Sequence, residues 1–166
     1  MKRLVLIRHA KSSWGGVGLA DFDRPLNERG KRDAPEMAQR LFSKKIKIDA
    51  FISSPAKRAK STCKAFCKVF KVPEDEIIFI DELYHANTDV FNKVIRSLNN
   101  KYGNIALFSH NPGITDFANS LCEGIRTDNM PTCAVFAVES DITEWNEFEN
   151  AGKKFLFFEY PKSGGS

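Results

Sequence analysis

Three short clusters of polar residues have side chains that could do chemistry on an anion. Arg8 and His9 follow one apolar run, Arg58 lies shortly after a second, and His110 follows a third. A guanidinium group is a planar fork that matches phosphate oxygens. A neutral imidazole can attack phosphorus and hold the phosphoryl group as a phosphohistidine. If the three clusters meet in space, they form a site for phosphoryl transfer.

The elements that must position these clusters are strands that alternate with helices. Short apolar runs typical of buried strands occupy residues 3–8, 49–53, 77–80 and 104–109, and apolar residues recur at helical spacing over residues 27–44, 55–70, 88–99 and 112–122. This alternation predicts an α/β fold, a three-layer sandwich with a mostly parallel central sheet and helices on both faces. Because ligands bind beyond the carboxyl ends of the strands in such sheets, we expect the three clusters to converge at one edge.

Finer signals set the expected limits of these elements. Ser54 is expected to cap the second helix, with Pro55 at its first helical position. Residues 132–139 and 154–160 are expected to add two strands to the sheet as a hairpin-like unit. We expect one domain over residues 1–162 and a flexible tail over residues 163–166.

Composition and charge exclude several classes of protein. Of the 166 residues, 42% are hydrophobic and 28% are charged, which is ordinary for a globular domain and excludes a disordered chain. Residues 1–72 hold 18 Lys and Arg against 6 Asp and Glu, whereas the rest of the chain holds 7 against 15. Two explanations account for this asymmetry equally well. Either the first half builds an electropositive site for an anion, or the two halves pair their opposite charges across one folded surface.

Signals for export or for a membrane are missing from the sequence. A continuous run of only four apolar residues precedes Arg8, which is too short for the core of a signal peptide, and no later stretch approaches the ~18 apolar residues that cross a bilayer. The four cysteines are too few for a secreted disulfide scaffold. We therefore expect a cytoplasmic chain with reduced thiols and no membrane partner.

Three weaker signals have simpler explanations than a ligand site. The glycine-rich stretch 15–18 lacks the Gly-Lys-Ser/Thr of a P-loop and predicts a flexible turn beside the site. Cys63 and Cys67 share one helix face, and no histidine stands at ligand spacing, so an apolar helix face is favoured over a metal site. The lysine-rich stretch 57–71 is typical of the solvated face of a helix, and we expect no nucleic-acid partner.

Four motifs in the chain resemble the histidine phosphatase superfamily, which includes the cofactor-dependent phosphoglycerate mutases. They are Leu6-Ile7-Arg8-His9-Ala10-Lys11, Asp23-Arg24-Pro25-Leu26-Asn27-Glu28-Arg29-Gly30, Ser53-Ser54-Pro55-Ala56-Lys57-Arg58-Ala59 and Ser109-His110-Asn111-Pro112-Gly113. They occur in the order and approximate spacing of the family. Together with Tyr160-Pro161-Lys162 near the end, they make the chain most similar to the short bacterial phosphohistidine phosphatase branch.

This resemblance implies a role for each matching residue. His9 would be the nucleophile that becomes phosphorylated, with Arg8 and Arg58 holding the phosphate and His110 donating to one of its oxygens. We also expect Asn111 and Asp21 to contact the substrate. The family often has Gly after the motif histidine, whereas this chain has Ala10, which the phosphohistidine branch tolerates. No metal and no cofactor is expected.

The proton donor for the leaving group is less well defined. In the mutase-like members a Glu after the third strand serves as general acid, and Glu82 stands at the matching place. Asp21 and His85 are competing candidates, and a reaction without a general acid is the remaining alternative, since a phosphohistidine leaving group is a ring nitrogen that takes a proton easily.

The function that these patterns favour is a metal-independent phosphatase that hydrolyses phosphohistidine on a protein, for example on a phosphorelay domain. Only 38 residues separate Asp49 from Thr88, which leaves little room for an insert that caps the site and so favours a protein substrate. The alternatives are a phosphomonoesterase for small phosphorylated metabolites, a mutase, and a phosphate-binding module without catalysis. The sequence is silent on the oligomeric state.

Overall fold

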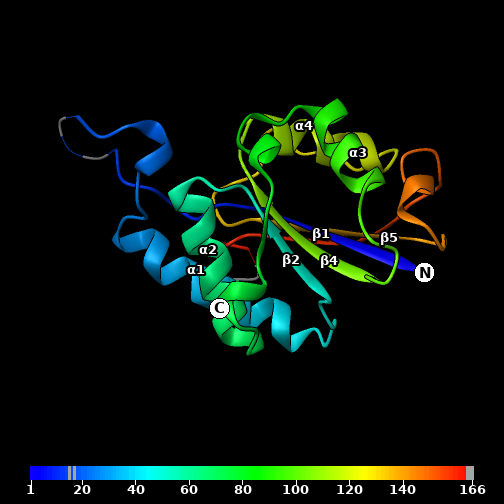
Figure 1. The fold of residues 1–166 in the computed structure, drawn as a ribbon, viewed down its shortest axis with the longest axis horizontal. Coiled ribbons are helices and arrows are strands. Elements are labelled where there is room, and N and C mark those ends of the chain that lie inside the picture. The colour runs from blue at the N-terminus through cyan, green and yellow to red at the C-terminus, as the bar shows by residue number, and fades with distance from the viewer. Residues whose placement is uncertain (15, 17, 164–166) are drawn as a thin grey trace.

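The computed structural model describes residues 1–14, 16 and 18–163, and its centre is a six-stranded sheet in the order β3-β2-β4-β1-β5-β6 (Figure 1). The strands are β1 (Lys2–Arg8), β2 (Ala50–Ser53), β3 (Ile78–Phe79), β4 (Asn104–Ser109), β5 (Val135–Ser140) and β6 (Lys154–Glu159). β1 to β4 run parallel, which puts their carboxyl ends at one edge. β5 pairs antiparallel with β1, and β6 pairs antiparallel with β5, so the expected two-strand addition is confirmed.

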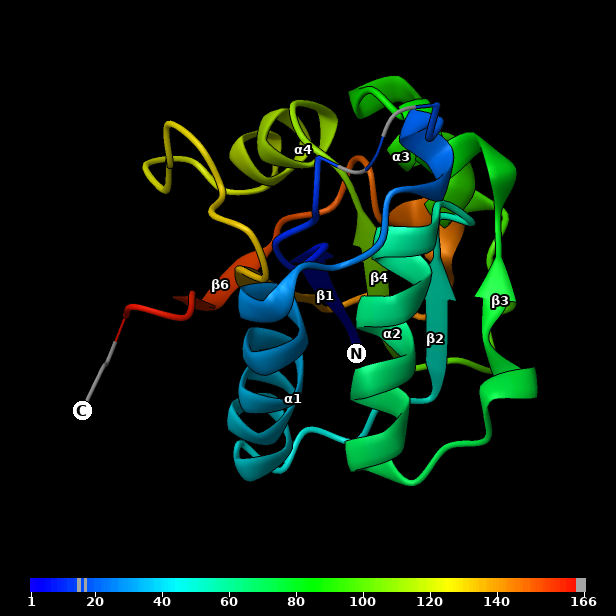
Figure 2. The same ribbon diagram turned by 90° about the vertical axis from the view of Figure 1, so that its left-hand side faces the viewer.

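Helices cover both faces of the sheet, as expected. They are α1 (Glu28–Ser43) and α2 (Lys57–Phe70) on one face, and α3 (Thr88–Arg96) and α4 (Gly113–Leu121) on the other (Figure 1 and Figure 2). The alternation of side chains along β1 supplies both cores, because Leu4 and Leu6 pack beneath α3 and α4, whereas Val5 and Ile7 pack beneath α1 and α2. None of the helices in the described part of the chain has the length and apolarity that a membrane crossing requires.

Several elements begin or end at residues other than those expected. α2 begins at Lys57, because the Ser54 hydroxyl accepts a hydrogen bond from the Ala56 N–H and Pro55 lies in the turn before the helix. The third strand is shorter than the apolar run 77–80, since the chain turns into the 3₁₀ helix Asp81–His85. α3 ends at Arg96 rather than residue 99.

Ser163, the first residue of the tail expected over 163–166, is hydrogen bonded to the body of the protein. The Arg40 guanidinium donates to the Ser163 carbonyl oxygen at 2.8 Å, and the Ser163 N–H donates to the Tyr160 carbonyl oxygen at 2.8 Å. Residues 164–166 lie outside the described part of the chain.

Residues 11–27 form a loop between β1 and α1 whose two ends are joined (Figure 1, blue). Ser12 and Leu26 form an antiparallel bridge, the Ser13 N–H donates to Pro25, and the Asn27 N–H donates to Lys11. Its far part carries the 3₁₀ turn Asp21–Asp23. The stretch 15–18, expected to be a flexible turn, lies within this loop, and its residues 15 and 17 lie outside the described residues.

Two glycines allow helices to approach the segments beside the site. A Cβ atom on Gly30 of α1 would lie 2.1 Å from the Lys11 carbonyl oxygen, and one on Gly113 of α4 would lie 1.8 Å from the Ala86 carbonyl oxygen. Both contacts are with backbone, which cannot move aside as the end of a side chain can.

Gly113→Ala should therefore destabilise the fold by about 1–3 kcal/mol or more, because the added methyl group forces α4 away from Ala86. Gly152→Ala is the matched control, since nothing lies within 4 Å of a Cβ atom there, and it should change the free energy of unfolding by less than ~1 kcal/mol. Denaturant unfolding of the two variants measures the difference, and equal midpoints would contradict the close approach.

Candidate active site

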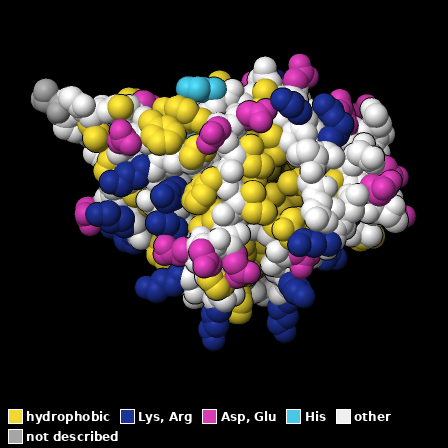
Figure 3. Space-filling view, viewed as in Figure 1, with side chains coloured by type: hydrophobic (Ala, Val, Ile, Leu, Met, Phe, Trp, Pro, Cys, Tyr) yellow, Lys and Arg dark blue, Asp and Glu magenta, His cyan; other side chains and the backbone are white. Residues whose placement is uncertain are grey.

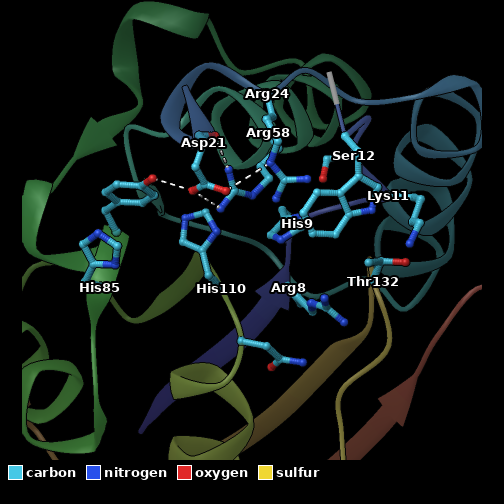
Figure 4. Close-up of a pocket in the computed structure, with 13 residues that line it drawn as sticks. Arg8, His9, Lys11, Ser12, Asp21, Arg24, Arg58, His85, His110 and Thr132 are labelled. Carbon is cyan, nitrogen blue, oxygen red and sulfur yellow. Dashed lines mark hydrogen bonds and ion pairs between the residues drawn. The ribbon is translucent and has the colours of Figure 1, made fainter. Parts of the chain in front are cut away.

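A cavity of about 350 Å³ lies beyond the carboxyl ends of β1 and β4 and the start of α2 (Figure 4). The following residues line it: Arg8, His9, Lys11, Ser12, Trp14, Asp21, Arg24, Arg58, Tyr84, His85, His110, Asn111 and Thr132. The three polar clusters of the sequence thus meet at the expected edge of the sheet. Four positive side chains and two buried imidazoles make the cavity suited to an anion.

The imidazole of His9 is held as a neutral base. Its Nδ1 lies 2.7 Å from the Ala10 carbonyl oxygen, which can only accept, so Nδ1 carries the hydrogen and Nε2 carries a lone pair. Burial lowers the pKa of His9 to about 3, and the nearby guanidinium groups of Arg8 and Arg58 act in the same direction. A ring nitrogen with a free lone pair at neutral pH can act as a nucleophile.

His110 lies beside His9, with ring centroids 5.1 Å apart. Its Nε2 lies 2.7 Å from the Ser54 hydroxyl oxygen, which already accepts the Ala56 N–H and has its own hydrogen to donate. When the Ser54 hydroxyl donates to Nε2, the ring hydrogen lies on Nδ1, a buried atom with no partner in the described part of the chain. Burial, with His9 close by, lowers the pKa of His110 to about 2.

The two guanidinium groups are only partly satisfied by protein atoms. One nitrogen of Arg8 donates to the Met130 carbonyl oxygen at 2.8 Å, and Arg58 donates to the backbone and the carboxylate of Asp21 at 2.8 and 3.1 Å. The Nε atoms of both arginines are buried without a partner. Within the described residues, these two atoms and Nδ1 of His110 are the full set of buried side-chain donors left unpaired. Unpaired buried donors are rare and costly, so their gathering around one cavity indicates an oxygen-rich ligand.

Asp21 links the loop to the floor of the cavity. Its carboxylate accepts from the Tyr84 hydroxyl at 2.5 Å and from Arg58 and Arg24, each at 3.1 Å (Figure 4). The bond from Tyr84, with those from the two arginines, lowers the pKa of Asp21 to about 2. The carboxylate is therefore ionised at neutral pH and occupies Arg58 as an internal anion.

Hydrogen bonds from Thr62 and Cys133 to the backbone fix the end of β1, which carries the site. The Thr62 hydroxyl of α2 accepts the Ala10 N–H at 2.9 Å and donates to the Arg58 carbonyl oxygen at 2.8 Å. The Cys133 N–H donates to the carbonyl oxygens of both Arg8 and His9, and Cys133 adopts a φ of 63°. This left-handed conformation is uncommon outside glycine and is held here by the pairing around it.

The structure brings together all the expected site residues except one. Glu82 is not among the residues that line the cavity, because its carboxylate turns to Lys93 at 3.1 Å and its side chain is 52% exposed. Glu82, which was expected to face the leaving group, lies at the start of the 3₁₀ helix Asp81–His85 and points away from the cavity. The other two candidates for that role, Asp21 and His85, do line the cavity.

Several lining residues were not singled out from the sequence. Lys11 and Arg24 stand in the quoted motifs. Their membership in those motifs, with Lys11 two residues after His9, is the sequence signal that could have identified them. Trp14, Tyr84 and Thr132 come from loops and carry no sequence signal for this position. In the described part of the chain, no group of three or more His, Cys, Asp or Glu residues is arranged to hold a metal ion, and Cys63 and Cys67 are buried in the core of α2 as expected.

The neutral state of the two histidines should appear in their titration. In the unfolded chain an imidazole takes a proton near pH 6.5, whereas His9 and His110 stay neutral in the native state until about pH 3 and 2. The unfolded state then binds more protons as the pH falls below about 6.5, so their contribution to stability is complete above this pH and is lost progressively below it. Ring ¹⁵N NMR should show both histidines neutral at pH 5, with the hydrogen of His9 on Nδ1. Protonation of His9 with a midpoint near 6.5 would contradict this description.

Comparison with known proteins agrees with this geometry. Residues 4–91 match the histidine phosphatase superfamily (branch 1). A chloroplastic protein of Arabidopsis thaliana, itself uncharacterised, is 30% identical over 154 residues, which cover 88% of this chain and 70% of that protein. Phosphoserine phosphatase 1 of Hydrogenobacter thermophilus is 38% identical over 86 residues, 49% of this chain and 40% of that enzyme.

A solved structure matches nearly the whole chain. The SixA protein of Agrobacterium tumefaciens, assigned as a phosphohistidine phosphatase, superposes with a TM-score of 0.80 and 26% sequence identity, covering 96% of this chain and 98% of that one. The family match, the shared fold and the cationic cavity at the edge of the sheet together identify the chain as a phosphatase that belongs to the histidine phosphatase superfamily, in its short, SixA-like branch.

Proposed function

We propose that the protein hydrolyses phosphohistidine on a protein through a phosphohistidine intermediate on His9, without a metal ion. The observation that carries this proposal is the set of unpaired buried donors around a neutral imidazole. Nε of Arg8, Nε of Arg58 and Nδ1 of His110 offer three N–H groups to the oxygens of one phosphoryl group. The Nε2 lone pair of His9 is the nucleophile that such a group would meet.

The reaction has two steps on this mechanism. The lone pair of His9 Nε2 forms a bond to phosphorus, the bond from phosphorus to the substrate nitrogen breaks, and its electron pair stays on the leaving imidazole, which is neutral if its other nitrogen carries a proton. Water then attacks phosphorus, the bond to His9 breaks, and inorganic phosphate leaves. Arg8, Arg58 and His110 stabilise the charge that spreads over the phosphoryl oxygens in both steps.

Asn111 and Asp21 contribute in different ways on this proposal. The amide nitrogen of Asn111 is bound to Asn129 and Met130, and its side-chain oxygen accepts from Thr115, so Asn111 fixes the turn after His110 from the rim of the cavity. An ionised Asp21 repels a phosphate, so we assign it a role other than holding the phosphoryl group. Asp21 positions Arg58, and the incoming phosphate competes with it for that guanidinium group.

Two relatives support different substrates. The similarity of the whole fold to SixA of Agrobacterium tumefaciens supports phosphohistidine as the substrate. The shorter match to phosphoserine phosphatase 1 supports a small phosphomonoester as the second candidate. A phosphohistidine needs less help from an acid than an alcohol does, and Glu82, the residue that matches the family's acid, faces Lys93 instead of the cavity. This last observation favours the phosphohistidine substrate.

The test compares phosphate release from a phosphohistidine peptide and from a panel of O-phosphate esters, with EDTA present. Wild type should prefer the phosphohistidine peptide, and His9→Ala should lower kcat/KM by more than about 10³-fold, since the nucleophile is removed. Rapid quenching of wild type should trap acid-labile phosphate on His9. Preference for an ester with the same dependence on His9 would move the substrate class to small metabolites, and activity that survives His9→Ala would overturn the mechanism.

The ion pair between Asp21 and Arg58 predicts how a substitution of Asp21 changes inhibition by phosphate. Asp21→Asn removes the internal anion from Arg58, so inorganic phosphate should inhibit roughly two- to fivefold more tightly. Glu82→Gln is the matched control and should change neither inhibition nor turnover, because that carboxylate pairs with Lys93. A fall in kcat for O-esters of about 10² or more in Asp21→Asn, with phosphate affinity unchanged, would instead identify Asp21 as the proton donor.

A further inference from the structure

Large apolar side chains are exposed at the mouth of the cavity. Of the six that stand out as exposed in the described part of the chain, three belong to the loop 11–27, and we call two of these, Trp14 and Phe22, the apolar rim. Trp14 is 82% exposed, and its ring lies 4.4 Å from the guanidinium carbon of Arg24. The ring of Phe22 meets that of Tyr84 edge-on at 5.1 Å. Exposed apolar groups that gather in one place are typical of an interaction surface.

A second hollow of about 290 Å³ adjoins the cavity on the side of α2. It is lined by Phe22 and Asp23 from the loop, by Pro55, and by three lysines at the start of α2 together with Ser61. The two hollows are lined by neighbouring residues of the same segments, since Phe22 follows Asp21 and Lys57 precedes Arg58. A protein that covers the mouth of the cavity would therefore also lie over this hollow.

Lys57, Lys60 and Lys64, which we call the lysine stripe, recur at i, i+3 and i+7 and lie on one face of α2 over about 10 Å of helix. Lys57 and Lys60 have no carboxylate partner in the described part of the chain, and Lys64 pairs with Glu74 at 3.4 Å. Figure 3 shows a group of Lys and Arg side chains beside a hydrophobic patch on the side where α2 lies in Figure 1. The stripe begins one residue before Arg58, so it leads directly away from the site.

We propose that the apolar rim and the lysine stripe form a docking surface for a protein that presents its phosphohistidine from an amphipathic helix with acidic residues one to two turns away. This inference rests on the proposed function and adds what the protein partner must carry. The helix would lay its apolar face on Trp14 and Phe22 and pair its carboxylates with Lys57 and Lys60.

The same surface fits a nucleic acid less well. Asp23 lines the hollow, and Glu74 stands at the far end of the lysine stripe, so a continuous phosphate backbone would run into both carboxylates. Separate carboxylates on a partner helix can reach Lys57 and Lys60 without meeting either one.

The test uses two helical peptides that are chemically phosphorylated on one histidine and differ only in carrying glutamates or glutamines one and two turns away. At low salt, wild type should hydrolyse the glutamate peptide with a kcat/KM roughly tenfold higher than the glutamine peptide, and this preference should vanish at about 0.5 M salt. Lys60→Glu with Lys64→Glu should abolish the preference and leave the hydrolysis of free phosphohistidine unchanged. Lys47→Glu with Lys154→Glu, two exposed lysines outside the hollow, is the control and should keep the preference.

The outcomes separate this inference from the proposed function. Failure of wild type to hydrolyse either phosphohistidine peptide would overturn the proposed function, and docking could still be followed by the fluorescence of Trp14 as the unphosphorylated peptides are added. Equal kcat/KM for the two peptides, or a preference that survives Lys60→Glu with Lys64→Glu, would overturn the docking surface. Sub-micromolar inhibition by a single-stranded oligonucleotide, without a preference for the glutamate peptide, would assign the stripe to nucleic acid and overturn it as well.

Discussion

Positive charge gathered in a place that water reaches poorly is the constraint on which the site depends. Arg8 and Arg58 are close enough that burial and mutual repulsion lower the pKa of Arg8. Such a pair costs free energy unless an anion is present, because desolvated charges of like sign repel. Burial, with the field of these guanidinium groups added to it, keeps His9 neutral, and burial with His9 and Arg58 nearby does the same for His110. The carboxylate of Asp21 offsets part of the positive charge by pairing with Arg58. On the proposed function, burial of a cationic site therefore serves both the binding of phosphate and the neutral state of the nucleophile.

The strand ends explain why so much of this site could be predicted from the sequence. β1 and β4 are short, buried and parallel, and their register pairs Arg8 with Ser109, so the residues that follow each strand must meet. The parallel register alone is enough to predict that His9 and His110 lie close together. The position of Arg58 could be predicted because it lies at the start of the helix that follows β2. The helix begins at Lys57 rather than at the expected Pro55, and Arg58 still lies at the edge of the sheet.

The loops could not be predicted in the same way, because their positions depend on contacts distant in sequence. Glu82 was expected to face the cavity from its place after the third strand, but the 3₁₀ helix that follows turns it to Lys93. Tyr84, two residues later, reaches Asp21 across 63 residues of sequence, and no local pattern encodes that pairing. The Met130 carbonyl oxygen that holds Arg8 is equally remote in the chain.

The strand ends and the loops also contribute different parts of the site. On the proposed mechanism, the strand ends supply the groups that act on phosphorus, and they are fixed by the sheet. The loop 11–27 supplies Trp14 and Asp21 to the wall of the cavity. A scaffold that is rigid at the reacting atoms and variable at the walls allows one chemistry to serve many substrates.

The Thr62 hydroxyl has a further consequence for how the molecule loses activity. By accepting the Ala10 N–H and donating to the Arg58 carbonyl oxygen, it ties the segment that carries His9 to the start of α2. The end of β1 cannot move away from α2 without breaking the bond from Ala10, so the two segments are coupled at this edge. On the proposed mechanism, opening of this edge separates the nucleophile from one of the two guanidinium groups that would hold the phosphate.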